Sequence, residues 1–499
     1  MSAEELNHVL KARRDKLAAL EAAGVAPYAY GFDRTHSAAG AVAEFGDRGG
    51  DEEGPEVRVA GRIVAWRAHG KTAFAHLADE NGRIQLYIRR DVVGEEAFAR
   101  LDLFDIGDVV GAAGPLFRTR TGEVTVRVTS LEMLAKSLRP LPFGKEEMVD
   151  GVAVRHSGFA DPEQRYRQRY ADLAVHPEVR RRFVARSRMI SAIRSFLDGL
   201  GYLEVETPVL QPLYGGAAAR PFVTHHNALD STLYLRIADE LYLKRLVVGG
   251  FERVYEIGHD FRNEGIDRTH NPEFTMLEFY EAYADYERMM ARVEALLPAA
   301  ADAVRASIGG EVEVPVFTPP FPRIEWVGSL NQGLGADAMA MDDAELRNTA
   351  SRVGVSSPES LSRPKLLDEL FQELVERKID RPTFVVDYPV ALSPLAKPKR
   401  GNPELTERFE LFAEGRELAN AFSELNDPLD QRRRLEGQAA LRASGDLEAS
   451  GVDEDYLRAM EYGMPPMGGV GVGLDRLFMY LSGAQNIRDV ILFPTLRPE

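Results

Sequence analysis

The sequence predicts an α+β protein in which a small N-terminal β-barrel precedes a larger domain built on an antiparallel sheet flanked by helices. Two observations on the 499-residue chain predict this fold class. Residues 57–128 hold five short segments that read as strands, separated by turn residues. Beyond about residue 172, strand-like and helix-like segments follow one another without the regular alternation of a parallel sheet. With 44% hydrophobic residues, the chain can bury the cores of two or three domains.

Four segments are expected along the chain. Residues 1–55 should form an amphipathic helix, at 4–23, and then a linker rich in glycine and acidic residues, at 46–54. The barrel should occupy residues 56–137, and an extended, proline-containing connector should run over 138–171. The second domain should span 172–499 and open with a helix at about 178–200.

The five barrel segments carry a hairpin signal and one helical interruption. Asn81 and Gly82 form a two-residue turn between two of the segments, and residues 94–101 read as helical. This pattern suits an OB-type barrel, which binds oligonucleotides on one face, although a small β-barrel of another use has the same pattern. The net charge of −17 argues against a general nucleic-acid coat, but residues 56–136 hold 12 Lys and Arg against 11 Asp and Glu.

Composition limits the chemistry. The chain has no cysteine, which excludes disulfides and thiolate metal sites and suits a reducing, cytoplasmic setting. A metal ion would need carboxylate or histidine ligands, which favours Mg²⁺ or a similar hard ion. No segment has the length of a membrane span, and the first residues do not resemble a signal peptide, so we expect no membrane partner.

Residues 256–264 and 270–280 read as two strands joined by a long polar hairpin loop. Two-residue periodicity places Arg262 and Glu264 on one face of the first strand, and aligns Phe274, Glu278 and Tyr280 on the second. Burying an arginine and carboxylates beside aromatic rings is costly without a ligand, which favours a binding surface over a salt-bridged solvent face.

A second hairpin is expected over residues 408–424, and a glycine-rich segment follows it. Asn420, Phe422 and Glu424 share one face of the hairpin. Gly468–Gly473 is expected to open a helix whose accessible backbone favours a negatively charged group, although most such glycines serve packing. The chain has no P-loop, so that kind of nucleotide site is not expected.

Taken in this order, these segments resemble the three signature motifs of class II aminoacyl-tRNA synthetases. Residues 201–208 resemble the dimer-interface motif, Phe261–Glu264 the second motif and Gly471–Arg476 the third. The preceding barrel narrows the resemblance to the lysyl, aspartyl and asparaginyl subgroup. Residues 215–217, 239–244, 393–397 and 422–427 are similar to lysyl-tRNA synthetase segments of the bacterial type, and this likeness spans nearly the whole chain.

The resemblance implies a lysine–tRNA ligase that is a cytoplasmic homodimer. Such an enzyme activates lysine with ATP to lysyl-adenylate and pyrophosphate, then transfers lysine to the 3′-terminal ribose of its tRNA. It also implies up to three Mg²⁺ ions.

The resemblance further implies a role for individual residues. Arg262 and Arg476 would be catalytic. Lysine would be held by Gly216, Glu240, Arg262, Glu278, Tyr280, Asn420, Phe422 and Glu424. ATP would be held by Arg262, Asn263, Glu264, His270, Asn271, Phe274, Glu417, Leu418, Gly473 and Arg476. Mg²⁺ would be held by Glu410 and Glu417, and the anticodon contacted by Arg67, Phe74 and Gln85.

Physical reasoning agrees with several of these roles. Acidic groups deep in the pocket suit the lysine ammonium, whereas an aspartate-selective site should place cations there. Arg476 is expected over the adenine face opposite Phe274. In the barrel, Phe74 can stack on a base or belong to the core, and Arg67 can be merely solvated.

Two positions depart from the family pattern, and three other functions compete. Ala391–Leu392 and Met467 replace the usual residues, and neither is expected to touch a residue assigned to chemistry. The alternatives are a nucleic-acid-binding barrel with an inactive synthetase-like domain, a ligase that modifies a protein, and charging with aspartate or asparagine. Retention of the motif residues argues against the first, and the barrel argues against the second.

Overall fold

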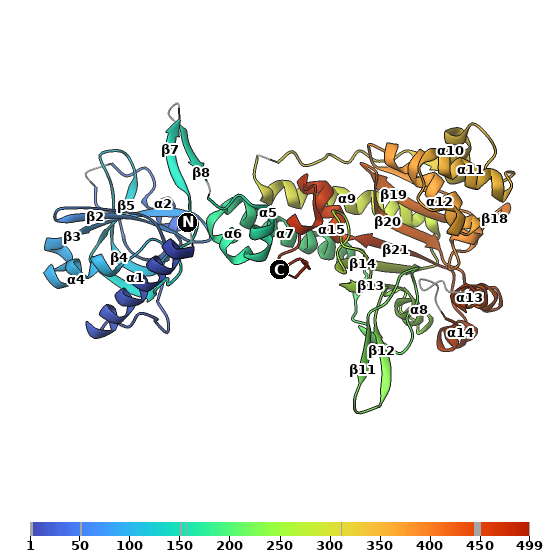
Figure 1. The fold of residues 1–499 in the computed structure, drawn as a ribbon, viewed down its shortest axis with the longest axis horizontal. Coiled ribbons are helices and arrows are strands. Elements are labelled where there is room, and N and C mark those ends of the chain that lie inside the picture. Colours follow the sequence, from blue (N-terminus) through green and yellow to red (C-terminus); the bar gives the residue numbers. More distant parts are fainter. Residues whose placement is uncertain are drawn as a thin grey trace. The chain divides into compact units, whose positions relative to one another are not determined.

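The computed structural model describes residues 3–49, 52–149, 152–156, 158–310, 312–443 and 451–498 (Figure 1). The chain divides into two compact units, Met1–Val175 and His176–Glu499. The limits predicted for the linker and connector remain predictions.

The first unit is built on a closed barrel. Its strands are β1 (Glu56–His69), β2 (Thr72–Ala78), β3 (Arg83–Arg89), β4 (Val109–Arg118) and β5 (Val124–Val128). They pair in the order β1-β2-β3-β5-β4, and β4 returns to pair with β1. A sixth strand, β6 (Ser130–Ala135), pairs with β4. The five predicted strands and the helical interruption, α4 (Glu95–Ala99), are confirmed.

Helices complete the barrel unit. The predicted N-terminal helix is α1 (Ala3–Ala22), and α3 (Arg90–Val93) lies between β3 and β4 in the chain. After β6 come β7 (Lys145–Val149), β8 (Val152–His156), α5 (Pro162–Arg167) and α6 (Arg169–Val175). The sequence analysis missed α2 (Ala38–Phe45). Eight residues are too few for a helix to be stable alone, but Ser37 caps it and Phe45 is fully buried in the barrel core.

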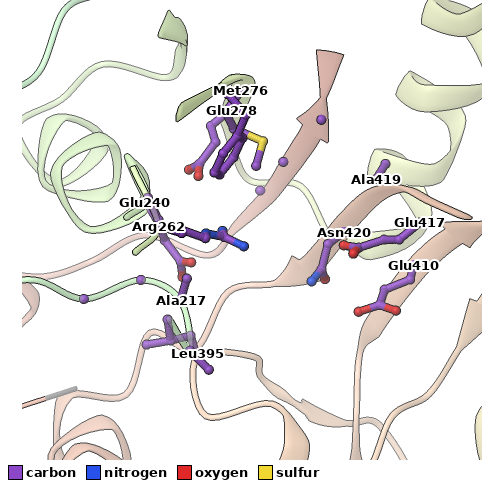
Figure 2. Close-up of a pocket in the computed structure, with 18 of the residues that line it drawn as sticks. Ala217, Glu240, Arg262, Met276, Glu278, Leu395, Glu410, Glu417, Ala419 and Asn420 are labelled. Carbon is purple, nitrogen blue, oxygen red and sulfur yellow. The ribbon is translucent and has the colours of Figure 1, made fainter. Parts of the chain in front are cut away.

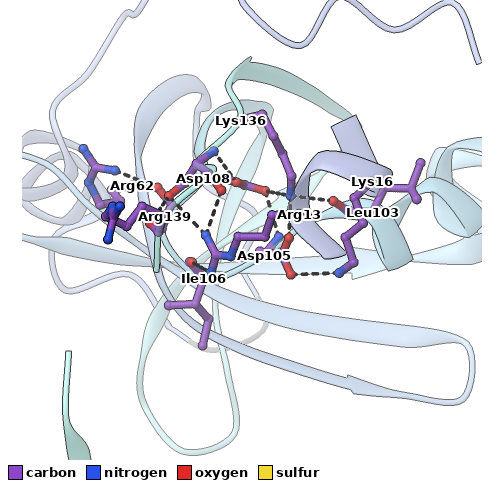
Figure 3. Close-up of polar contacts among 11 residues, drawn as sticks. Arg13, Lys16, Arg62, Leu103, Asp105, Ile106, Asp108, Lys136 and Arg139 are labelled. Atoms are coloured by element: carbon purple, nitrogen blue, oxygen red, sulfur yellow. Dashed lines mark hydrogen bonds and ion pairs between the residues drawn. The ribbon is translucent and has the colours of Figure 1, made fainter. Parts of the chain in front are cut away.

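A buried polar network ties α1 to the barrel (Figure 3). The Lys136 ammonium is fully buried and lies 2.6 Å from Asp105 and 2.9 Å from Asp108. Lys16 of α1 reaches Asp105 at 2.8 Å, and Arg13 donates to the backbone carbonyl of Ile106 at 2.9 Å. Because each buried charge has a partner, the network fixes α1 on the barrel.

The second unit is an eight-stranded sheet covered by helices (Figure 1). The strand order is β15-β16-β19-β20-β21-β14-β13-β9. It is antiparallel except at its ends, where β15 runs parallel to β16 and β9 runs parallel to β13. The strands are β9 (Leu203–Glu204), β13 (Arg253–Phe261), β14 (Glu273–Ala282), β15 (Arg323–Glu325), β16 (Thr383–Val386), β19 (Arg408–Ala413), β20 (Arg416–Ser423) and β21 (Met467–Gly473).

One face of this sheet packs against three helices in the largest hydrophobic cluster. They are α7 (Pro177–Gly199), which was predicted, α9 (Tyr286–Ile308) and α15 (Leu474–Ser482). Farther along the chain, α10 (Trp326–Leu334) is followed by α11 (Asp343–Val353) and α12 (Arg363–Leu374). The other α-helices and strands of this unit are α8 (Glu240–Val248), α13 (Pro428–Ala443), α14 (Glu454–Glu461), β10 (Leu210–Gln211), β11 (Val223–His226), β12 (Ser231–Leu235), β17 (Pro398–Lys399) and β18 (Asn402–Thr406).

Two local expectations were wrong. β13 ends at Phe261, so Arg262 and Glu264 lie in the following loop rather than on the strand. The Arg262 backbone N–H still donates to Pro272 across the hairpin, at 2.9 Å. Gly468–Gly473 forms the central strand β21 instead of opening a helix, because β14 and β20 hydrogen-bond to both its edges. Helix α15 begins only at Leu474.

No helix in the part of the chain that the structure describes is both long and apolar enough to span a membrane.

Candidate active site and nucleic-acid interface

A cavity of about 500 Å³ opens on the face of the sheet opposite α7, α9 and α15 (Figure 2). Most of the predicted site residues line it: Gly216, Glu240, Arg262, Glu264, His270, Asn271, Phe274, Glu278, Tyr280, Glu410, Glu417, Leu418, Asn420, Phe422, Gly473 and Arg476. Asn263 and Glu424 are not among its described lining residues. Residues from five sequence regions therefore meet at one site.

Strand periodicity decides which side chains of β14 reach the cavity. Met276, Glu278 and Tyr280 line it, whereas Leu277 and Phe279 are fully buried in the core on the opposite face. This alternation is the one predicted from the sequence.

The glycines of β21 make room for the side chains beside them. A Cβ atom on Gly469 would lie 2.3 Å from Glu424 Oε1 and 2.3 Å from the Tyr280 ring. Val470 and Val472, the alternate residues, are buried in the core. β21 therefore presents glycine to the cavity and valine to the helices.

Glu278 lines the cavity, and its neighbours determine its hydrogen bonds and its pKa. The Tyr280 hydroxyl donates to Glu278 Oε2 at 3.0 Å, and the Asp239 backbone N–H reaches Glu278 Oε1 at 3.4 Å. Burial, reinforced by the charges of Asp260 and Glu240, raises the pKa of Glu278 well above its usual value. A cation in the cavity would relieve this effect.

Glu240 and Glu424 are joined by an ammonium that the sequence analysis did not single out. Lys244, on α8, forms ion pairs with both carboxylates, and its side chain is fully buried. Glu240 is one helical turn before it, so the i, i+4 spacing was the available signal. Burial raises the pKa of Glu424 to about 8, against the opposing effect of Lys244.

A second cluster beneath Glu278 was also missed. The Arg236 guanidinium lies 2.8 Å from Asp239, 2.6 Å from Glu256 and 3.3 Å from Asp260. Oxygens of Asp239, Asp260 and Glu278 lie within 4.8 Å of one another. Burial, with the charges of Asp260 and Glu278, raises the pKa of Asp239 to about 10. The Arg236 guanidinium and a proton retained on Asp239 therefore offset part of the negative charge of this cluster.

Arg262 and Arg476 approach the cavity from different elements. The Arg262 guanidinium carbon lies 5.1 Å from the centre of the Phe274 ring, and Nε donates to the Ile237 carbonyl at 3.3 Å. Arg476 lies 2.9 Å from His270 Nε2 and 3.3 Å from Glu417. Because Arg476 can only donate, His270 accepts at Nε2.

Glu410 and Glu417 lie in a separate part of the cavity from Glu240, Glu278 and Arg262 (Figure 2). Glu410 accepts from the Tyr388 hydroxyl at 2.8 Å and pairs with Arg408. Burial and, more weakly, the charge of Glu417 raise the pKa of Glu410 to about 7, although Arg408 opposes this. Two carboxylates of this kind fit Mg²⁺, which takes one or two protein carboxylates and keeps other positions for water and phosphate.

The two departures from the family pattern touch the site through their backbones. The Leu392 carbonyl accepts from Arg408 at 2.7 Å, and the Met467 carbonyl accepts from the Glu424 N–H at 2.9 Å. The expectation that Met467 touches no assigned residue was therefore wrong. Because a backbone carbonyl makes each contact, neither hydrogen bond depends on the identity of the side chain, although Met467 itself is buried in a hydrophobic cluster.

The barrel carries an aromatic row on its outer surface. The Phe74 and Tyr87 rings stack with centres 4.8 Å apart, and Phe117 lies 5.9 Å from Tyr87. Phe74 alternates with Ala73 and Ala75, which are fully buried, so it faces away from the core. Arg67 is paired with Phe74 across the strands, and the Arg127 guanidinium carbon lies 4.9 Å from the Phe117 ring centre.

Gln85 lies nearby but is already engaged. Its amide nitrogen donates to Glu123 at 2.7 Å, and its oxygen accepts from Thr125 at 2.9 Å. A base reaching Gln85 would compete with Glu123. The row of Phe74, Tyr87 and Phe117 is the more accessible stacking surface.

Sequence models of two protein families match different parts of the chain. The sequence model of the family described as class II tRNA synthetases (D, K and N) matches residues 161–497, and that of the OB-fold nucleic acid binding domain matches residues 57–134. A lysine–tRNA ligase of Moorella thermoacetica is 51% identical over 505 residues, covering 100% of both chains. Lysine–tRNA ligases of Carboxydothermus hydrogenoformans and Clostridium perfringens are 50% and 49% identical, covering 100% and 99% of this chain and 100% and 97% of their own lengths.

Proposed function

Because the chain belongs to the class II tRNA synthetases of the lysyl, aspartyl and asparaginyl group, we propose that its cavity binds lysine and ATP and joins lysine to tRNA. The reaction forms lysyl-adenylate and pyrophosphate, and the lysyl group then passes to the 3′-terminal ribose. The observation that carries the choice of lysine is the set of buried carboxylates, Glu240, Glu278 and Glu424, around one pocket.

Lysine selection follows from the charge of that pocket. An amino acid with a neutral side chain would leave buried carboxylates without a partner, which costs free energy. An aspartate side chain would add a negative charge beside Glu278, whose pKa is already raised by burial and by neighbouring acids. Gly216, Tyr280, Asn420 and Phe422 would enclose the bound lysine.

Activation needs positioning and charge stabilisation rather than a protein nucleophile. Arg262 would bridge the lysine carboxylate and the α-phosphate of ATP, and Phe274 and Arg476 would enclose the adenine ring. The same cavity is lined by Glu264, His270, Asn271, Leu418 and Gly473. Asn263 would contribute from the loop, where its backbone N–H donates to the Arg220 carbonyl at 2.7 Å.

Glu410 and Glu417 would hold Mg²⁺, which neutralises phosphate charge when bound. In the barrel, Phe74 would stack on an unpaired anticodon base, with Arg67 and Gln85 beside it. We further propose that the protein acts in the cytoplasm as a homodimer, in line with its cysteine-free sequence and with the 201–208 segment.

The test is ATP–pyrophosphate exchange with each of the twenty amino acids, on the unaltered protein and on Glu424→Gln. We expect exchange with lysine alone, and a KM for lysine raised at least about tenfold in Glu424→Gln, because a buried ammonium loses its charged partner. Glu281→Gln is the matched control, since Glu281 is buried on β14 but does not line the cavity. Exchange with aspartate or asparagine would overturn the lysine assignment, and no exchange at all would favour an inactive synthetase-like domain.

A further inference from the structure

The buried ammonium of Lys244 stands behind the wall of the proposed lysine pocket. Its Nζ atom forms ion pairs with Glu240 Oε1 and Glu424 Oε2, and lies 5.8 Å from the centre of the Phe422 ring. Glu240 and Phe422 line the cavity, whereas Lys244 is not among the described lining residues. Lys244 therefore contacts residues that would bind lysine without facing the ligand itself.

The ion pairs occupy only one oxygen of each carboxylate. Glu424 Oε1 lies against Gly469, where an added Cβ would approach within 2.3 Å of it. Glu240 Oε2 lies 3.8 Å from the position of a Cβ on Gly216. Both glycines line the cavity. The second oxygen of each carboxylate thus lies beside a glycine of the cavity wall, next to the Tyr280 ring at Gly469 and near Ala238 at Gly216.

Among the described residues, no cation other than Lys244 forms an ion pair with either carboxylate. Tyr456 and Tyr280 pack around them, together with apolar residues of α8 and α14. The charges acting most strongly on Glu424 are those of Lys244 and Glu240, and those acting on Lys244 are Glu240, Glu424 and Tyr456. Without Lys244, Glu240 and Glu424 would repel each other in an apolar environment.

We propose that Lys244 is a positioning residue for lysine selection, whose ammonium holds one oxygen of Glu240 and one of Glu424 and leaves the other oxygen of each for the ammonium groups of the substrate. This inference rests on the proposed function. Lys244 opposes the rise that burial causes in the pKa of Glu424, and its two ion pairs fix the orientation of both carboxylates before lysine arrives. The free energy needed to order the two carboxylates and bring their charges together is then supplied by folding, so that it does not weaken the binding of lysine.

The test replaces Lys244 by methionine, which has a similar length and no charge. In ATP–pyrophosphate exchange, Lys244→Met should raise the KM for lysine at least about tenfold and leave the KM for ATP within about twofold. The acidic limb of kcat/KM for lysine should move to higher pH, because Glu424 retains its proton to a higher pH without the opposing charge of Lys244. In a Glu424→Gln background the same replacement should cost much less, since one of its partners is already neutral.

Lys136→Met provides the matched control. Lys136 is an equally buried lysine between two carboxylates, Asp105 and Asp108, but it lies in the barrel unit. It should lower stability and leave the KM for lysine unchanged. If Lys244→Met does not fold, Lys244→Gln carries the same expectations.

Three results would overturn the inference. They are an unchanged KM and pH profile in the Lys244 variant, a full additive loss in the Glu424→Gln background, and an equal rise in KM for Lys136→Met. Failure of the unaltered protein to show lysine-dependent exchange would instead overturn the proposed function.

Discussion

At the scale of single residues, the proposed lysine pocket requires a glycine at position 469. Gly469 lies on the central strand β21, paired with Phe422 of β20 on one side and with Tyr280 of β14 on the other. A methyl group there would lie 2.3 Å from Glu424 Oε1 and 2.3 Å from the Tyr280 ring. Real Cβ atoms do not approach neighbours so closely, so any side chain must displace Glu424, Tyr280 or the strand.

Gly469→Ala should therefore impair lysine binding far more than its size suggests. We expect the KM for lysine in ATP–pyrophosphate exchange to rise at least about tenfold, because Glu424 and Tyr280 lose their positions. Gly437→Ala is the control: Gly437 is exposed on α13, has no neighbour within 4 Å of an added Cβ, and should become slightly more stable. An unchanged KM in Gly469→Ala would contradict the assigned pocket.

The sequence predicted some residues of the site but not others. Glu278 and Tyr280 could be placed on the cavity face because a strand alternates its side chains. Lys244 could not, because a lysine on an amphipathic helix reads as solvated unless its burial is known. The cluster around Arg236 was also missed, because its partners come from separate segments of the chain.

At the scale of elements, strands with a local sequence pattern were predicted correctly, whereas elements that depend on contacts with distant segments were not. The two hairpins, β13–β14 and β19–β20, came from local periodicity. The glycine-rich strand β21 did not, because isolated glycines disfavour strands and only pairing with β14 and β20 reveals the assignment. Helix α2 depended similarly on tertiary packing.

The junction of β14 with α9 offers a prediction on stability. Glu281, which is 2% exposed, receives hydrogen bonds from Tyr202 at 2.8 Å, Arg288 at 2.9 Å and Arg292 at 2.9 Å, and lies 3.2 Å from Arg253. Burial would raise the pKa of Glu281, but these donors outweigh it and lower the pKa to about 2.

Because the folded pKa is depressed, Glu281 stabilises the protein above its unfolded value, near 4.5, and this contribution is lost as the pH falls towards about 2. Glu281→Gln should lower the free energy of unfolding by up to about 3 kcal/mol at pH 7, with the difference from the unaltered protein shrinking between pH 4.5 and pH 2. The chain has two tryptophans, so in a Trp66→Phe background the fluorescence of Trp326 reports on the second unit. A pH-independent difference would show that lost packing, not lost charge, is responsible. The exposed pair Glu454–Arg432 gives the control, and Glu454→Gln should change little.

At the scale of the whole molecule, the proposed tRNA-binding surface and the proposed site of amino-acid activation lie in different units. The aromatic row of Phe74, Tyr87 and Phe117 belongs to the barrel unit, and every described residue that lines the cavity belongs to the second unit. Each unit has its own hydrophobic core. A change confined to the barrel surface should therefore leave amino-acid activation intact.

Phe74→Ala tests this separation. Removing one stacking platform should lower kcat/KM for tRNA in aminoacylation by about tenfold or more, whereas tRNA-independent ATP–pyrophosphate exchange should not change. Tyr30→Ala is a matched control, because Tyr30 is a fully exposed aromatic residue of the same unit outside the row. A loss of exchange activity in Phe74→Ala would mean that the barrel surface supports the fold of the active site. An unchanged kcat/KM for tRNA would remove Phe74 from the nucleic-acid interface. A selective loss would leave Phe74 as a base-stacking residue, because only the step that involves tRNA senses it.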